Sequence, residues 1–144
     1  MRVLLDINVC IALLDPSHVF HERAHAWWSS NGKHGWASCP LTENGLVRIM
    51  SNPSYSKEIR LSMDDLIETL DTFAGATDHE FWPDDLSIRN GDVFIRERLH
   101  GSARLTDVYL LALATKRKGR LATFDEGITI SAVKNAKPHN LVHI

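Results

Sequence analysis

Short apolar runs alternate with longer amphipathic stretches along the whole chain. The apolar runs predict strands at Arg2–Leu5, Gly35–Ser38, His79–Trp82, Arg120–Phe124 and Leu141–His143. The amphipathic stretches predict helices at Ile7–Leu14, His18–Ser30, Pro40–Met50, Ser62–Ala74, Asp92–Leu99 and Thr106–Arg117. Strands that alternate with helices in this way favour an α/β fold: a three-layer sandwich with a mainly parallel central sheet and helices on both faces.

Helix boundaries carry their usual chemical signals. Asp15-Pro16 closes the first predicted helix, and Ser17 suits the N-cap of the second. Pro40 fits a first helical position, and Ser62 is the N-cap predicted for the fourth helix. These signals place most of the predicted helices independently of the apolar pattern.

Size and composition indicate one ordinary globular domain over residues 1–144. The chain is 44% hydrophobic and 24% charged, which excludes disordered and low-complexity classes. Its apolar runs are far shorter than the roughly 20 residues that span a bilayer, and no secretory signal is evident at the N-terminus. Two cysteines do not make a disulfide framework, so we expect reduced thiols in a cytoplasmic protein without a membrane partner.

Net charge changes this picture little. The 16 Lys and Arg residues against 18 Asp and Glu residues give −2, which argues against a strongly basic nucleic-acid binder. If four of the acids belong to one metal site, however, the remaining side chains carry +2. Nucleic-acid binding is therefore compatible with the composition.

Two predicted strands end in an aspartate. Asp6 follows Val3-Leu4-Leu5, and Asp125 follows Leu121-Ala122-Thr123-Phe124. Ligands of open α/β sheets bind at the carboxyl ends of the strands, so both aspartates are expected at one edge of the sheet. A single Asp after a strand commonly only caps the next helix, whereas two at one edge indicate a shared site.

Two predicted helices carry an acid on their apolar face. Residues three and four apart share a helix face, so Glu43 lines up with Leu46 and Met50, and Asp107 with Leu111. Both acids lie near helix N-termini, where the helix dipole favours an anion, but the dipole does not explain an inward-facing carboxylate. Burying a carboxylate is costly unless it is paired or binds a metal. We therefore expect all four acids to converge.

Four clustered carboxylates repel one another unless a cation lies between them. All-oxygen ligation suits Mg²⁺ or Mn²⁺ better than Zn²⁺. Such a site performs metal-assisted hydrolysis by an activated water molecule, and a phosphodiester is its natural substrate because the phosphate oxygens bind the ions.

Four residue strings carry a resemblance to a known family: Leu4-Leu5-Asp6-Ile7-Asn8-Val9, Cys39-Pro40-Leu41-Thr42-Glu43-Asn44, Thr106-Asp107-Val108-Tyr109-Leu110-Leu111-Ala112 and Ala122-Thr123-Phe124-Asp125. At these residues the chain resembles the PIN-domain family, and within it the VapC-type toxin ribonucleases of bacterial toxin–antitoxin pairs. The resemblance extends over nearly the whole chain. It implies an Mg²⁺-dependent endoribonuclease that forms a homodimer, with a cognate antitoxin occupying the cleft.

The resemblance also implies roles for individual positions. Asp6 and Asp107 would be the principal metal ligands, and Glu43 and Asp125 would complete the catalytic site. Asn8 and Thr123 would support the site by orienting a carboxylate or a water molecule. After Asp125 the chain departs from the family pattern and continues Glu126-Gly127-Ile128, so any further acidic contribution would come from Glu126.

Basic residues near these motifs are candidates for RNA contacts. Arg117 and Lys118 belong to a charged run at a helix C-terminus, and Arg104 precedes the helix that carries Asp107. The run also suits a solvated helix end, while phosphate contact is the functional alternative. Trp36 and Trp82 fit core packing better than base stacking.

Three other functions fit parts of the sequence. His21-Glu22-Arg23-Ala24-His25 matches the H-E-x-x-H pattern of zinc hydrolases, with Glu43 as a conceivable third ligand, but this leaves the aspartates without a role. Asp6-Ile7-Asn8 is similar to phosphatases with an aspartyl nucleophile, except that Asn8 replaces their second aspartate. A PIN-like fold can also serve as a non-catalytic binding module.

Overall fold

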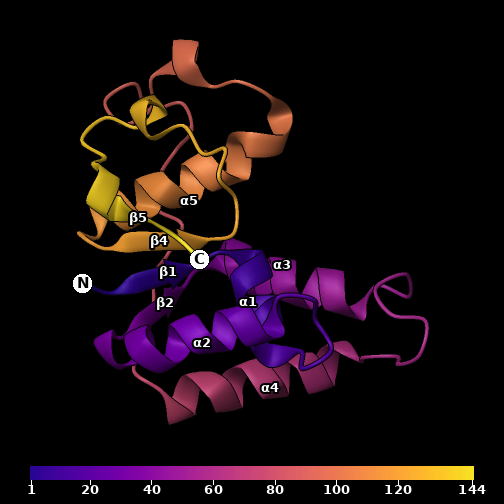
Figure 1. Ribbon diagram of the computed structural model, residues 1–144. Coiled ribbons are helices and arrows are strands. Elements are labelled where there is room, and N and C mark those ends of the chain that lie inside the picture. Colours follow the sequence, from indigo (N-terminus) through magenta and orange to yellow (C-terminus); the bar gives the residue numbers. More distant parts are fainter.

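The centre of the computed structural model, which describes residues 1–144, is a five-stranded sheet in the order β3-β2-β1-β4-β5 (Figure 1). Every strand pairs with its neighbours in parallel, which confirms the predicted α/β fold with its parallel central sheet. The strands are β1 (Val3–Leu5), β2 (Trp36–Ser38), β3 (His79–Phe81), β4 (Arg120–Thr123) and β5 (Leu141–His143). The α-helices are α1 (Ile7–Leu14), α2 (His21–Asn31), α3 (Pro40–Ser51), α4 (Met63–Ala76) and α5 (Leu105–Lys116).

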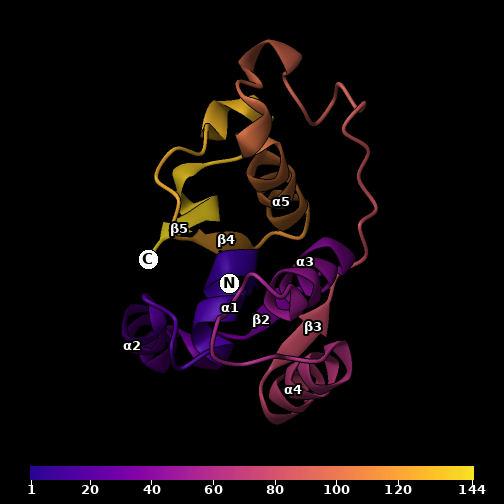
Figure 2. The same cartoon turned by 90° about the vertical axis from the view of Figure 1, so that its right-hand side faces the viewer.

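The sheet separates two hydrophobic cores. Helices α1, α2 and α4 lie below the sheet and α5 above it, as Figures 1 and 2 show from two directions. Successive strand residues point to opposite sides of the sheet. Val3 and Leu5 belong to the core between the sheet and α1–α4, whereas Leu4 belongs to the core between the sheet and α5. None of the helices combines the length and hydrophobicity needed to cross a membrane.

Helix boundaries follow the predicted signals with one shift. Helix α1 has the predicted bounds, and Ser62 accepts a hydrogen bond from the backbone N–H of Asp65 as the N-cap of α4. Helix α2 begins at His21 instead of His18, because Asp15 Oδ1 accepts the backbone N–H of Ser17 in a turn. Ser17 thus belongs to the connection and is not the N-cap.

The predicted helix Asp92–Leu99 is wrong. This segment forms turns and a short 3₁₀ helix, Arg96–Arg98, packed beside residues 130–134. Two backbone hydrogen bonds join it to that distant segment: Ile95 N–H donates to the carbonyl of Ala132, and Lys134 N–H to the carbonyl of Val93. Tertiary pairing therefore replaces the local hydrogen bonds that a helix needs.

Two tryptophans and both cysteines lie in the interior. Trp36 is 1% exposed and Trp82 is 3% exposed, so both rings pack in the core and neither is available to stack on a base. Cys10 and Cys39 are buried free thiols. Burial raises the pKa of the Cys10 thiol to about 12, which keeps it protonated.

Candidate active site

Three of the four predicted acids, Asp6, Asp107 and Asp125, line one cavity of about 230 Å³. Asp6 directly follows β1 and caps α1, Asp125 follows β4, and Asp107 lies in the first turn of α5. Strands β1 and β4 are parallel neighbours, so their carboxyl ends place the first two aspartates at the same edge of the sheet. Helix α5 packs on these strands and brings Asp107 to that edge.

A buried threonine joins two of the aspartates. Thr123 is fully buried, and its hydroxyl donates to Asp6 Oδ2 at 2.8 Å while accepting the backbone N–H of Asp125 at 3.0 Å. Asp6 Oδ1 also accepts the backbone N–H of Ile7 at 2.8 Å. Both carboxylate oxygens of Asp6 are therefore held, which fixes the direction in which this side chain meets the cavity.

The carboxylate of Asp125 is bound on its other side by a cation. Arg104, which ends the 3₁₀ turn before α5, donates from Nη1 to Asp125 Oδ2 in a partly exposed ion pair. Asp125 Oδ1 accepts the backbone N–H of Gly127 at 2.7 Å. The guanidinium lies directly on Gly127, where a Cβ atom would come within 2.6 Å of Arg104 Cζ.

The cavity carries an excess of negative charge. Burial, followed by the charges of Asp6 and Asp125, raises the pKa of Asp107 to about 7. Burial also raises the pKa of Asp6 despite its two hydrogen bonds. Of the three cavity aspartates, only Asp125 has a lowered pKa, owing first to the N–H of Gly127 and then to Arg104. The protein thus brings together carboxylates that are incompletely compensated by one arginine.

Glu43 does not line this cavity, contrary to the expectation that all four acids converge. It lines a separate groove between α3 and α4, and its Oε2 accepts the hydroxyl hydrogen of Ser38 at 2.5 Å. His79 Nε2 lies 2.7 Å from the same hydroxyl. Ser38 and His79 were not among the predicted site residues. The position of Ser38 at the end of β2, on the same sheet edge as Asp6 after β1, could have indicated it from the sequence.

Residues 3–134 match the PIN domain family. This chain is a PIN-domain protein. It is 46% identical to Ribonuclease VapC44 of Mycobacterium tuberculosis over 98% of both chains, and 40% identical to Ribonuclease VapC39 of the same species over 92% of this chain and 94% of that one. It belongs to the VapC-type members of the family.

Solved structures show the same fold at low sequence identity. VapBC2 from Rickettsia felis, bound to a DNA fragment from its promoter, matches this PIN domain with a TM-score of 0.58 at 15% identity, covering 100% of this chain and 99% of that one. Mycobacterium tuberculosis VapC20, a sarcin-ricin loop cleaving toxin, matches with a TM-score of 0.59 at 11% identity, covering 94% and 99%. The PIN fold therefore extends over the whole length of the chain.

Of the two remaining polar candidates, only Asn8 lines the PIN-domain cavity. Asn8 lines it with an exposed side chain, and Asp6 is held by Thr123 and Ile7 rather than by the Asn8 amide. Glu126 is exposed and lies 3.6 Å from His143. The cavity itself therefore draws its acids from Asp6, Asp107 and Asp125.

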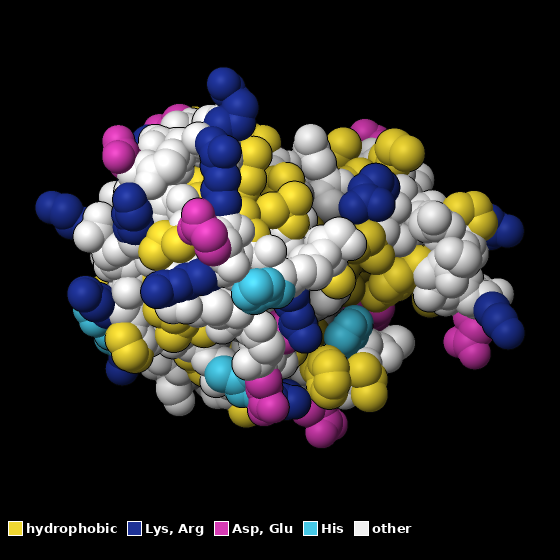
Figure 3. All heavy atoms as spheres, turned by 90° about the horizontal axis from the view of Figure 1, so that it is seen from above, with side chains coloured by type: hydrophobic (Ala, Val, Ile, Leu, Met, Phe, Trp, Pro, Cys, Tyr) yellow, Lys and Arg dark blue, Asp and Glu magenta, His cyan; other side chains and the backbone are white.

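Arg117 and Lys118 lie at the far end of α5 from Asp107, roughly 15 Å along the helix axis. Arg117 is paired with Asp85 at 2.9 Å. Figure 3, which views the molecule from the α5 side, shows Lys and Arg side chains scattered among apolar ones instead of gathered in one continuous patch. Of the three predicted RNA-binding residues, the structure brings only Arg104 to the acidic cavity.

The H-E-x-x-H segment is not arranged as a zinc site in this PIN domain. His21 Nδ1 lies 2.7 Å from the carbonyl oxygen of Ala12, and the His21 and His25 rings lie 4.4 Å apart between centroids. The conceivable third ligand, Glu43 of α3, is bonded to Ser38 at the end of β2. No three Asp, Glu, His or Cys side chains converge here with metal-site spacing.

Proposed function

We propose that this PIN domain is an Mg²⁺- or Mn²⁺-dependent endoribonuclease that acts as the toxin of a toxin–antitoxin pair. The observation that carries the proposal is the shared cavity of Asp6, Asp107 and Asp125 at the carboxyl edge of the sheet. Support comes from the 46% identity to a VapC ribonuclease along nearly the entire chain. The reaction is hydrolysis of an RNA phosphodiester bond, without a covalent enzyme intermediate.

The donor chemistry of the cavity fits a hard divalent cation. The cavity offers three carboxylates, and burial first, then the neighbouring carboxylates, raise the pKa values of Asp6 and Asp107. A bound cation would favour their ionised forms. Asp6 and Asp107 would hold the ion, with Asp125 as a further candidate. When bound, it would supply positive charge to the phosphate oxygens and lower the pKa of an attacking water molecule.

The protein contributes orientation. Thr123 and the N–H of Ile7 hold Asp6 in one direction, so its charge does not have to be reorganised when substrate arrives. The rest of the cavity lining combines apolar and polar side chains: Ile7, Asn8, Ile49, Thr106, Thr123 and Phe124.

The proposed partners are an RNA substrate, a cognate antitoxin that occupies the cleft, and a second copy of the chain in a homodimer. The likeness of the fold to VapBC2 supports the antitoxin. No membrane partner is proposed, and the cytoplasm is the proposed compartment.

Incubation of the purified protein with total cellular RNA, followed by mapping of the cleaved ends, tests the proposal. We expect cleavage with Mg²⁺ or Mn²⁺, none with EDTA, and none with Asp6→Asn, which removes a charge but keeps the shape of the side chain. The control His21→Ala should cleave normally. Wild-type turnover by Asp6→Asn contradicts the assignment, and binding of RNA without any cleavage favours the non-catalytic module.

A further inference from the structure

Arg104 lies at the border of the acidic cavity and already has a partner there. Its guanidinium bonds Asp125 Oδ2, it rests on the open face of Gly127, and its side chain remains 43% exposed. Its charge also opposes the rise in the pKa of Asp107 that burial and the other two aspartates cause. Arg104 is therefore the one arginine whose charge is coupled to the proposed catalytic aspartates.

Both carboxylate oxygens of Asp125 already have a hydrogen-bond partner. Asp125 Oδ2 accepts from Arg104, and Asp125 Oδ1 accepts from Gly127. The three aspartates line one cavity but do not form a three-ligand metal cluster in this arrangement. Arg104 and a divalent cation therefore compete for the same carboxylate.

The formal charge of the cavity indicates a second role for Arg104. Three aspartates and one arginine leave the cavity with a formal charge of −2, which a single divalent cation neutralises. A phosphodiester brings one further negative charge, and a guanidinium released from Asp125 would stand beside it. The planar guanidinium of arginine presents a fork of paired N–H donors that matches phosphate oxygens. Arg104 therefore has the donors needed to bind a phosphate without another side chain.

We propose that Arg104 changes partners: it pairs with Asp125 in the cation-free protein and with a phosphate oxygen of the RNA strand once a cation takes its place on Asp125. This inference rests on the proposed function and names a substrate-contacting residue for it. The same side chain thus weakens cation binding and strengthens RNA binding.

The variant Arg104→Gln separates these two effects, because it removes the charge and the fork. Titration with Mn²⁺ in a calorimeter, without RNA, should show affinity tighter by about two- to fivefold, the range for loss of a partly exposed ion pair. Binding of a fluorescent 2′-O-methyl RNA oligonucleotide of mixed sequence, followed by anisotropy in Mg²⁺, should weaken by about tenfold. The slope of log affinity against log salt should fall by about one.

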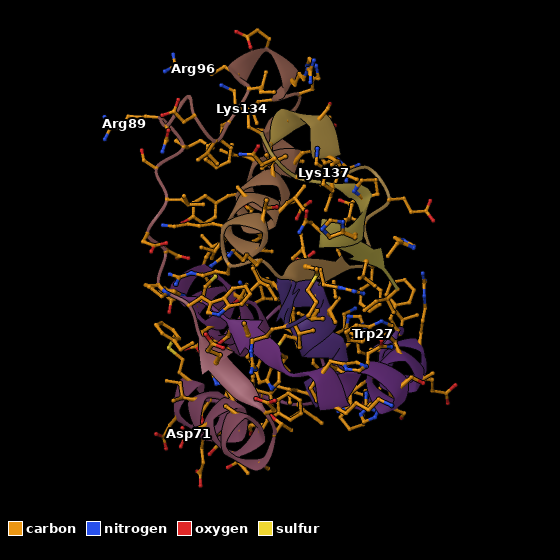
Figure 4. The ribbon with its side chains drawn as sticks, turned by 90° about the vertical axis from the view of Figure 1, so that its left-hand side faces the viewer. Trp27, Asp71, Arg89, Arg96, Lys134 and Lys137 are labelled. Carbon is orange, nitrogen blue, oxygen red and sulfur yellow. The ribbon has the colours of Figure 1, made fainter.

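Two further variants serve as controls. Arg104→Lys keeps the charge and should keep the salt slope, with RNA affinity between those of Arg104→Gln and the wild type. Arg89→Gln removes the same charge from a side chain that Figure 4 shows pointing outward from the segment between β3 and α5, and it should change neither measurement by more than about twofold.

Only opposite changes in the two affinities support the exchange. If Arg104→Gln weakens Mn²⁺ binding, or leaves RNA binding unchanged, Arg104 has a structural role and the inference is overturned. A wild-type protein that binds Mn²⁺ and RNA but cuts no RNA refutes the nuclease while leaving the exchange of partners intact, so the two failures are distinguishable.

Discussion

The two ends of α5 carry opposite balances of charge. At the C-terminal end, Lys116 and Arg117 both pair with Asp85, at 3.1 and 2.9 Å, so two cations surround one acid. At the N-terminal end, roughly 14 Å away along the axis, Asp107 lies in a cavity with two more aspartates and only Arg104 to compensate them. The helix dipole favours both arrangements, so it does not explain the difference.

The pKa values of Asp85 and Asp107 are shifted in opposite directions. A hydrogen bond from Lys116, followed by the charge of Arg117, lowers the pKa of Asp85, whereas burial and the charge of Asp6 raise the pKa of Asp107 to about 7. The C-terminal cluster is a satisfied surface network. The N-terminal cluster costs the folded state energy that a cation would recover, which is typical of a functional site.

The largest expected effect comes from Asp107→Asn. It removes a proposed cation ligand, so single-turnover cleavage of RNA should fall by at least about 10³-fold, since the cation supplies several kcal/mol of transition-state stabilisation. It also removes repulsion from Asp6, so the variant in EDTA at pH 8 should melt at a higher temperature than the wild type. A variant that is both active and less stable would contradict the comparison.

Thr123→Val should have the next largest effect. The substitution keeps the shape but leaves Asp6 Oδ2 and the N–H of Asp125 without their buried partner. We expect cleavage to fall by about 10- to 100-fold and the free energy of unfolding, measured with urea, to fall by about 1–3 kcal/mol. Thr123→Ser keeps the hydroxyl and should retain most activity; equal loss in both variants would show that the hydroxyl is not what matters.

The sequence predicted the elements whose signals are local. All five strands and α1 to α5 lie where apolar periodicity and caps predicted them, within a few residues. The segment Asp92–Leu99 failed because Val93 and Ile95 pair with residues 132–134, nearly forty positions away, and a local pattern contains no information about that partner.

The site divides in the same way. Asp6, Asp107 and Asp125 could be placed in advance because a strand end or a helix face fixes each backbone position. Glu43 also has a fixed backbone position, but the direction of its longer side chain depends on Ser38, which the helical pattern does not specify. Arg117 was misplaced because a helix returning across a parallel sheet carries its C-terminus to the opposite edge.

The pH dependence should show a moderate effect at the N-terminal end of α5. Between its ordinary pKa of 3.8 and about 7, Asp107 is protonated in the folded chain but ionised in the unfolded chain, so the unfolding free energy declines as pH rises through this range. Because cation binding displaces that proton, Mn²⁺ affinity should rise by up to about tenfold per pH unit below pH 7 and level off above it. Calorimetric titrations from pH 5.5 to 8.5 measure this, and Asp107→Asn should flatten the curve.

The smallest effect is expected at the C-terminal end, from Asp85→Asn. The pKa of Asp85 is lowered, whereas that of Asp107 is raised. The contribution of Asp85 to stability is therefore present at neutral pH and is lost on acidification. The variant should be slightly less stable than the wild type at pH 7, with the difference vanishing in acid, and should cleave RNA within about twofold of the wild-type rate. Thermal melts at pH 7 and pH 3 measure the first effect, and the cleavage assay measures the second. A large loss of cleavage would mean that Lys116 and Arg117 must be held by Asp85 for RNA to bind, and the two ends of α5 would then form one functional surface.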